Sequence, residues 1–107
     1  MYAFEVDELI KQQQAEERSY LEFIRQTSMS VGMYRLDAGD VDRQKPHAQD
    51  EMYYIVQGKG VINVAGEDRT VQSGTIVFVP ARMEHFFHFI TEDLVTLVFF
   101  APAETSH

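Results

Sequence analysis

The sequence predicts an all-β fold, a sandwich or a barrel, preceded by one short α-helix. Segments rich in β-branched and aromatic residues follow one another from Tyr20 onward, namely 20–26, 28–36, 51–57, 61–66, 75–80, 85–90 and 94–100. Breaks that contain Gly, Asp or Pro lie between them, as at 37–40, 57–60 and 72–75. Short strands with this spacing are typical of antiparallel sandwiches and barrels and not of alternating βα units.

A helix is predicted over residues 7–18, where strong helix formers occur without a run of β-branched residues. Asp7 is the expected N-cap. The apolar stripe of this helix is thin, with Leu9 and Ile10 followed mainly by glutamine and glutamate. We therefore expect it to lie over a surface and not inside the core.

The chain length and composition predict one domain. With 107 residues, 45% of them hydrophobic and 24% charged, the chain is in the ordinary globular range. No Pro- or Ser-rich linker and no low-complexity run divides it. We expect a single domain over 1–107, with the helix at about 7–18 and the barrel at about 20–102.

The charge balance and the absence of cysteine narrow the function classes. Nine Lys and Arg face 17 Asp and Glu, which gives a net charge of −8, so we expect neither a nucleic-acid nor an anionic membrane partner. Without cysteine, disulfides, thiolate metal sites and cysteine nucleophiles are excluded. The acidic N-terminus lacks the features of a secretory signal, and no apolar run approaches the ~20 residues of a membrane span. We expect a cytoplasmic protein.

A histidine and a glutamate stand four residues apart at the start of one predicted strand. His47 and Glu51 precede an aromatic and β-branched run that ends in a glycine turn. An extended strand would place His47, Gln49, Glu51, Tyr53 and Ile55 on one face. A histidine–glutamate pair inside the barrel without metal is the structural alternative to a metal site.

The later histidines have different expected roles. In a strand that begins at His85, the side chains of His85, Phe87 and Phe89 would share a face. Histidine and carboxylate on separate strands of a small barrel can converge on one metal. His88 has the opposite parity, so we expect it at the surface or in an interface, and we expect His107 in a flexible end.

The segment from Gly39 to Gly58 resembles the first motif of the cupin superfamily. That motif runs Gly, several residues, His-x-His, three or four residues, Glu, six residues, Gly. Here Gly39 lies in the right region, His47 matches the second histidine, and Glu51 and Gly58 are separated by six residues. Lys45 stands where the motif has its first histidine.

The second motif of the family is matched in part. It runs Gly, five residues, Pro-x-Gly, two residues, His, three residues, Asn. Gly74, Pro80 and His85 fall on it, whereas Arg82 replaces the motif glycine and Phe89 its asparagine. The resemblance covers most of the chain after residue 28.

The resemblance implies a cupin-type β-barrel, also called a double-stranded β-helix or jelly roll, with a divalent metal inside. Carried over to this chain, the ligands are His47, Glu51 and His85, and the metal would be Fe, Mn, Ni or Zn. Lysine is a poor ligand because its amine stays protonated. Two histidines and a carboxylate are nevertheless the facial triad of non-haem Fe(II) oxygenases. Gln49 is a candidate for a weak fourth oxygen ligand.

Two classes of function follow. In the first, a small organic molecule binds the metal and undergoes oxygenation or isomerisation, with Lys45, Gln49 and Tyr53 as candidates for proton transfer or orientation. In the second, the same pocket binds a ligand without turnover, with or without metal. Lys45 and Arg82 would favour an anionic substrate if they face the pocket, and are ordinary surface charges if they do not. The resemblance also implies a homodimer.

Overall fold

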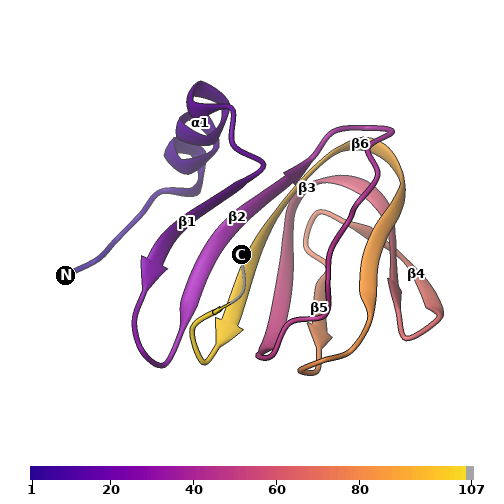
Figure 1. The fold of residues 1–107 in the computed structure, drawn as a ribbon. Helices are drawn as coiled ribbons and strands as arrows, with labels where there is room; N and C mark the ends of the chain where they lie inside the picture. Colours follow the sequence, from indigo (N-terminus) through magenta and orange to yellow (C-terminus); the bar gives the residue numbers. More distant parts are fainter. Residues whose placement is uncertain (106–107) are drawn as a thin grey trace.

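The structure, a computed structural model, describes residues 1–105 and confirms the all-β class with one N-terminal helix (Figure 1). His107 lies outside the described residues. The elements, in chain order, are α1 (Val6–Glu16), β1 (Tyr20–Arg25), β2 (Ser30–Leu36), β3 (Asp50–Val64), β4 (Glu67–Gln72), β5 (Ile76–Val79) and β6 (His85–Ala101). In this part of the chain, no helix has the length and hydropathy that crossing a bilayer requires.

The strands form an antiparallel sheet that curls into the predicted barrel. The strand order is β1-β2-β6-β3-β4, and β5 pairs with residues 51–54 of β3, on the same edge as β4 and opposite β6. The two longest strands, β3 and β6, pair along most of their length, and three register shifts fall between Ile55 and Val61. Figure 1 shows both strands arching over the top of the view and descending again on the other side. Bulges of this kind increase the local twist and curvature, which closes a sheet upon itself.

Two expected breaks turn out to lie inside continuous strands. The segment predicted at 51–57 and residues 61–64 of the one predicted at 61–66 are both part of β3, and those at 85–90 and 94–100 are both part of β6. The glycine that suggested a turn, Gly58, has a φ of 97° and sits at a bulge in β3. A glycine at positive φ serves a bulge as well as a turn, so its presence did not distinguish the two. The polar strand β4 was not predicted, because its sequence EDRTVQ alternates weakly and only Val71 is buried.

The core lies between the curled faces of the sheet. Its buried members come mainly from β3 and β6 and include Tyr53, Ile55, Ile62, Phe87, Leu94 and Val98. A second, smaller cluster joins α1 to the sheet through Leu9, Leu21, Met33 and Val95. Helix α1 therefore covers the outside of β1 and β2, as its thin apolar stripe predicted.

The helix differs from its predicted bounds at both ends. Glu5, not Asp7, occupies the N-cap, and Glu17 ends the helix in the left-handed conformation with a φ of 54°. The amide of buried Gln13 then donates to the carbonyls of Ser19 and Met33, at 3.1 and 2.9 Å. These hydrogen bonds tie the helix to the first two strands, which no periodicity of apolar residues would reveal.

Candidate metal centre

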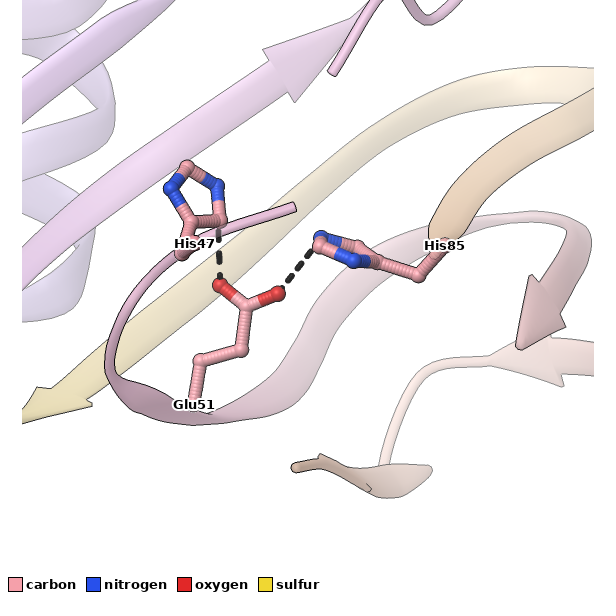
Figure 2. A group of neighbouring side chains, drawn as sticks. All are labelled: His47, Glu51 and His85. Atoms are coloured by element: carbon pink, nitrogen blue, oxygen red, sulfur yellow. Dashed lines mark ion pairs between the residues drawn. The ribbon is translucent and has the colours of Figure 1, made fainter. Parts of the chain in front are cut away.

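Three residues that are distant in the sequence meet inside the barrel: His47, Glu51 and His85. One ligand atom of each lies within 4.8 Å of the others. Figure 2 shows the carboxylate of Glu51 between the two imidazoles, with one oxygen turned towards each ring. His85 Nε2 is 2.5 Å from Glu51 Oε1, and His47 Nε2 is 3.9 Å from Glu51 Oε2. The structure thus brings together the three residues that the motif spacing singled out.

Each of the three side chains is positioned by a different piece of backbone. Glu51 is the second residue of β3 and faces inward with Tyr53 and Ile55, as the alternation predicted. His85 is the first residue of β6. His47 does not belong to a strand, contrary to prediction, because β3 begins at Asp50. The carbonyl of His47 instead accepts a 2.6 Å hydrogen bond from the backbone N–H of Arg82.

The second predicted face, on β6, is only partly confirmed. His85 and Phe87 are buried on the same side, whereas Phe89 is 74% exposed. Phe89 has a φ of 47° and lies where the pairing with β3 shifts register, so that Ile90 takes the inward position instead. A residue at positive φ inside a bulge reverses the alternation, which a pattern with period two cannot anticipate. His88 is on the opposite side, as predicted, and its Nε2 lies 2.9 Å from Asp68.

Burial and hydrogen bonding determine the state of His85. Burial by itself lowers the pKa of this imidazole, but its hydrogen bonds to Glu51 and to the carbonyl of Met83 together raise the pKa above the usual value. Nδ1 lies 3.0 Å from the Met83 carbonyl oxygen and donates to it. That hydrogen bond fixes the ring so that Nε2 points at Glu51, which is the usual orientation of a metal-binding histidine.

One carboxylate oxygen of the cluster has no hydrogen-bond donor in the described part of the chain. Among residues 1–105, Glu51 Oε2 is buried and accepts no hydrogen bond. A buried carboxylate oxygen without a donor is costly, and a divalent cation is one way to satisfy it. Two imidazoles and one carboxylate are also a common donor set for divalent transition metals. The residues present therefore fit a metal ion.

A cavity of about 280 Å³ adjoins the cluster. Its walls are mostly aromatic, with a few polar side chains. The lining residues are Tyr20, Tyr34, Gln44, His47, Tyr53, Val98, Phe100 and Glu104. A small, largely apolar pocket with convergent polar groups is typical of a site for a small molecule. His47 is the cluster member that lines it, so a bound metal would lie at the cavity wall.

Of the candidate pocket residues, Tyr53 lies at the cavity and Lys45 lies on the surface. Tyr53 is 1% exposed and lines the cavity, and its single hydroxyl hydrogen is shared between Gln44 Oε1 at 3.1 Å and Glu51 Oε1 at 3.3 Å. Burial and then the charge of Glu51 raise the pKa of Tyr53 well above its usual value. Lys45, in contrast, is exposed and is absent from the described lining of the cavity.

Gln49 also lies apart from the cluster. It is buried, but its amide donates to Thr105 Oγ1 at 2.8 Å, which ties the C-terminal segment to the loop before β3. Because β3 begins only at the following residue, the alternation that placed Gln49 beside Glu51 does not extend back to it.

Arg82 is exposed as well, so Lys45 and Arg82 are both surface charges in this structure.

Sequence reasoning missed two polar residues at the site, Gln44 and Glu104. Gln44 precedes the motif position of the first histidine by one residue, and its side-chain oxygen faces both imidazoles. Glu104 follows the last strand and is 5% exposed, with Oε1 3.7 Å from His47 Nδ1. A polar residue next to the motif was a usable signal for Gln44, whereas no local pattern pointed to Glu104.

Comparison with known proteins agrees with this fold. The family model described as "Cupin domain" matches residues 32–101, and the chain belongs to this family. An uncharacterized protein of Streptomyces coelicolor is 50% identical over 105 residues, which are 98% of this chain and 100% of that protein.

Solved structures are similar at lower identity. TT1209 from Thermus thermophilus has a TM-score of 0.78 at 24% identity, over 96% of this chain and 99% of that one. KdgF from a Halomonas species has a TM-score of 0.70 at 18% identity, over 81% and 88% of the two chains. The DMSP lyase DddQ from Ruegeria pomeroyi has a TM-score of 0.67 at 22% identity, over 71% of this chain and only 39% of the lyase chain. At these identities the likeness concerns the fold alone.

Proposed function

We propose that this cupin binds a divalent transition metal through His47, Glu51 and His85 and uses it to bind and transform a small organic molecule. The observation that carries the proposal is the convergence of the three ligand atoms within 4.8 Å at the wall of a cavity. The metal is Fe, Mn, Ni or Zn, and the reaction is an oxygenation or an isomerisation. When bound, such a metal polarises an oxygen of the organic ligand, and a redox-active one also supports chemistry with dioxygen.

The protein's own groups define how a ligand would be held. Tyr20, Tyr34 and Phe100 supply flat apolar surface, which suits a molecule with a carbon skeleton. The Tyr53 hydroxyl stays protonated because burial and Glu51 raise its pKa. It therefore serves as a hydrogen-bond donor and not as a base. Names of similar proteins, such as DMSP lyase, support action on a small molecule but select no substrate.

Metal analysis of the purified protein tests the proposal. Untagged protein prepared without added metal or chelator should contain about one equivalent of a transition metal, as measured by mass spectrometry. Glu51→Ala removes the carboxylate ligand, and His85→Ala removes a nitrogen ligand. Both variants should lose the metal. A metal-free wild type that also fails to take up Fe, Mn, Ni or Zn on reconstitution would refute the proposal.

We further propose that the protein is a cytoplasmic homodimer. Helix α1 and β1 already find partners within their own chain, through Leu9 and Leu21, so they do not by themselves require a second subunit. The outer face of β3 and β5 offers a better surface, because four exposed apolar residues face each other there in register, Met52 with Phe78 and Tyr54 with Ile76. Light scattering after size exclusion should give twice the 12.4 kDa chain mass. Phe78→Glu should give the monomer mass.

A further inference from the structure

A fourth polar side chain lies beside His47, Glu51 and His85, at a position where the family motif has no ligand. Where that pattern has its first histidine, this chain has exposed Lys45. The residue before it, Gln44, instead reaches the cluster: Gln44 Oε1 is 3.2 Å from His85 Nε2 and 3.5 Å from His47 Nε2. The Tyr53 hydroxyl donates to the same oxygen at 3.1 Å.

These separations are those of atoms that share a metal ion. Ligand atoms roughly 2.1 Å from a metal lie roughly 3.0 to 3.4 Å apart at octahedral or tetrahedral angles. The two distances from Gln44 Oε1 to the imidazole nitrogens are close to this range. An amide oxygen is an accepted ligand for hard and borderline divalent cations.

The orientation of the Gln44 amide is fixed from the opposite side. Its nitrogen donates to Asp42 Oδ2 at 2.7 Å. If the amide were turned over, its carbonyl would face the carboxylate of Asp42, which is an unfavourable contact between two acceptors. Asp42 therefore directs the Gln44 oxygen towards His47 and His85.

Asp42 is itself held firmly in place. It is 8% exposed, and Oδ2 also accepts a 2.8 Å hydrogen bond from the backbone N–H of Phe87 in β6. Oδ1 accepts a 2.6 Å hydrogen bond from the Tyr34 hydroxyl in β2. The carboxylate thus links two strands of the barrel to the one side chain that it orients, which is the usual arrangement of a group that supports a metal ligand.

We propose that Gln44 Oε1 is the fourth protein ligand of the metal, in place of the missing histidine and displaced from it by one residue, with Asp42 as its positioning residue. This inference rests on the proposed metal site of His47, Glu51 and His85. Replacing an imidazole by a neutral oxygen makes the donor set harder, which favours Mn²⁺ and Fe²⁺ relative to a site with three imidazoles. It also provides a weaker ligand that an incoming molecule can displace from the cavity side.

Titration with Co²⁺ tests the proposal in the full chain after removal of metal by a chelator. The affinity is measured by calorimetry and the coordination by the visible absorption of Co²⁺. Gln44→Leu, which has no donor atom, should weaken binding at least about tenfold and change the absorption bands. Lys45→Ala is the matched control at the motif position itself and should bind as the wild type does.

The outcomes separate this inference from the proposed function. If Gln44→Leu binds Co²⁺ with the affinity and the spectrum of the wild type, Gln44 is not a ligand and the inference is overturned, while the site of three ligands stands. If the wild type binds no Co²⁺ or other transition metal, the metal site itself is refuted. Should Gln44→Leu fail to fold by circular dichroism, Gln44→His provides the test. It should bind one equivalent with shifted bands, and bands identical to those of the wild type would contradict the proposal.

Discussion

The backbone N–H of Arg82 donates to the carbonyl of His47 at 2.6 Å, which joins the loop of one proposed metal ligand to the turn that precedes another, His85. Arg82 occupies the position where the second cupin motif has glycine, and it has a φ of 67°. This left-handed conformation explains why glycine suits the position, since a side chain there costs about 1 kcal/mol. The hydrogen bond depends only on the backbone of Arg82.

Arg82→Gly should therefore raise the free energy of unfolding by about 0.5 to 1 kcal/mol without changing metal affinity. The gain arises from relief of the left-handed strain and is reduced by the greater flexibility of the unfolded chain. Urea denaturation measures it. Arg82→Ala is the control, because it removes the same exposed side chain but keeps a Cβ at positive φ. If both variants have equal stability, backbone strain at Arg82 is not the reason.

Gly58→Ala should be far more damaging than Gly74→Ala. Both glycines have a positive φ, of 97° and 94°, but a Cβ at Gly58 would lie 2.1 Å from the carbonyl oxygen of Asp93, whereas at Gly74 it would meet nothing within 4 Å. Gly74→Ala should cost about 1 to 2 kcal/mol from the backbone alone. Gly58→Ala adds a clash between β3 and β6, so we expect more than about 3 kcal/mol, or no folded protein. Similar losses for the two variants, measured by thermal unfolding, would contradict the close approach of these strands.

Metal removal should lower thermal stability. A ligand that binds only the folded state stabilises it by about 4 kcal/mol at a concentration 1,000 times its dissociation constant. For a domain of about 100 residues this raises the melting temperature on the order of 10 °C or more. Scanning fluorimetry with increasing Mn²⁺ or Co²⁺ should show the rise, and chelator should reverse it. Glu51→Ala should show no rise, and an equal rise in this variant would indicate that the metal binds elsewhere.

Alkaline pH should destabilise the fold through three phenols, of which Tyr53 is buried and Tyr20 and Tyr34 are half-buried. Burial raises the pKa of Tyr20, Tyr34 and Tyr53, aided by Glu22 for Tyr20 and by the hydrogen bond to Asp42 for Tyr34. Their folded pKa values exceed the unfolded value of 10.0, so the unfolded chain releases protons first. The stability they contribute is complete below pH 10 and falls as the pH rises above it.

Tyrosinate absorbance at about 295 nm measures this effect. In a variant with Tyr2→Phe and Tyr54→Phe, which removes the two exposed tyrosines, the remaining signal should appear in one cooperative step. That step should coincide with the loss of circular dichroism. Gradual ionisation near pH 10 with the fold intact would show that the three phenols are accessible to solvent.

Much of the candidate site could be predicted from the sequence, because His47, Glu51 and His85 fall on positions of the two cupin motifs. The six-residue interval from Glu51 to Gly58 reflects the length of β3 between its buried start and its bulge. The alternation that placed Glu51 and Tyr53 on one face holds because both lie in regular strand.

The orientations of the other side chains depend on contacts that have no periodicity in the sequence. Phe89 turned outward because a bulge reverses the alternation in β6. Gln44 lies in a loop, where the direction of a side chain follows from hydrogen bonds such as the one to Asp42 and not from its position in a repeat. The motif spacing points to position 45, which is a lysine, and not to Gln44 beside it.

Anomalous X-ray scattering from crystals grown with Co²⁺ tests the central claim most directly, because it locates the metal without assuming its ligands. We expect a single strong peak about 2.0 to 2.3 Å from His47 Nε2, His85 Nε2 and a carboxylate oxygen of Glu51, with the Gln44 oxygen at a similar distance. A peak elsewhere in the protein, or none at this cluster under saturating Co²⁺, would contradict it.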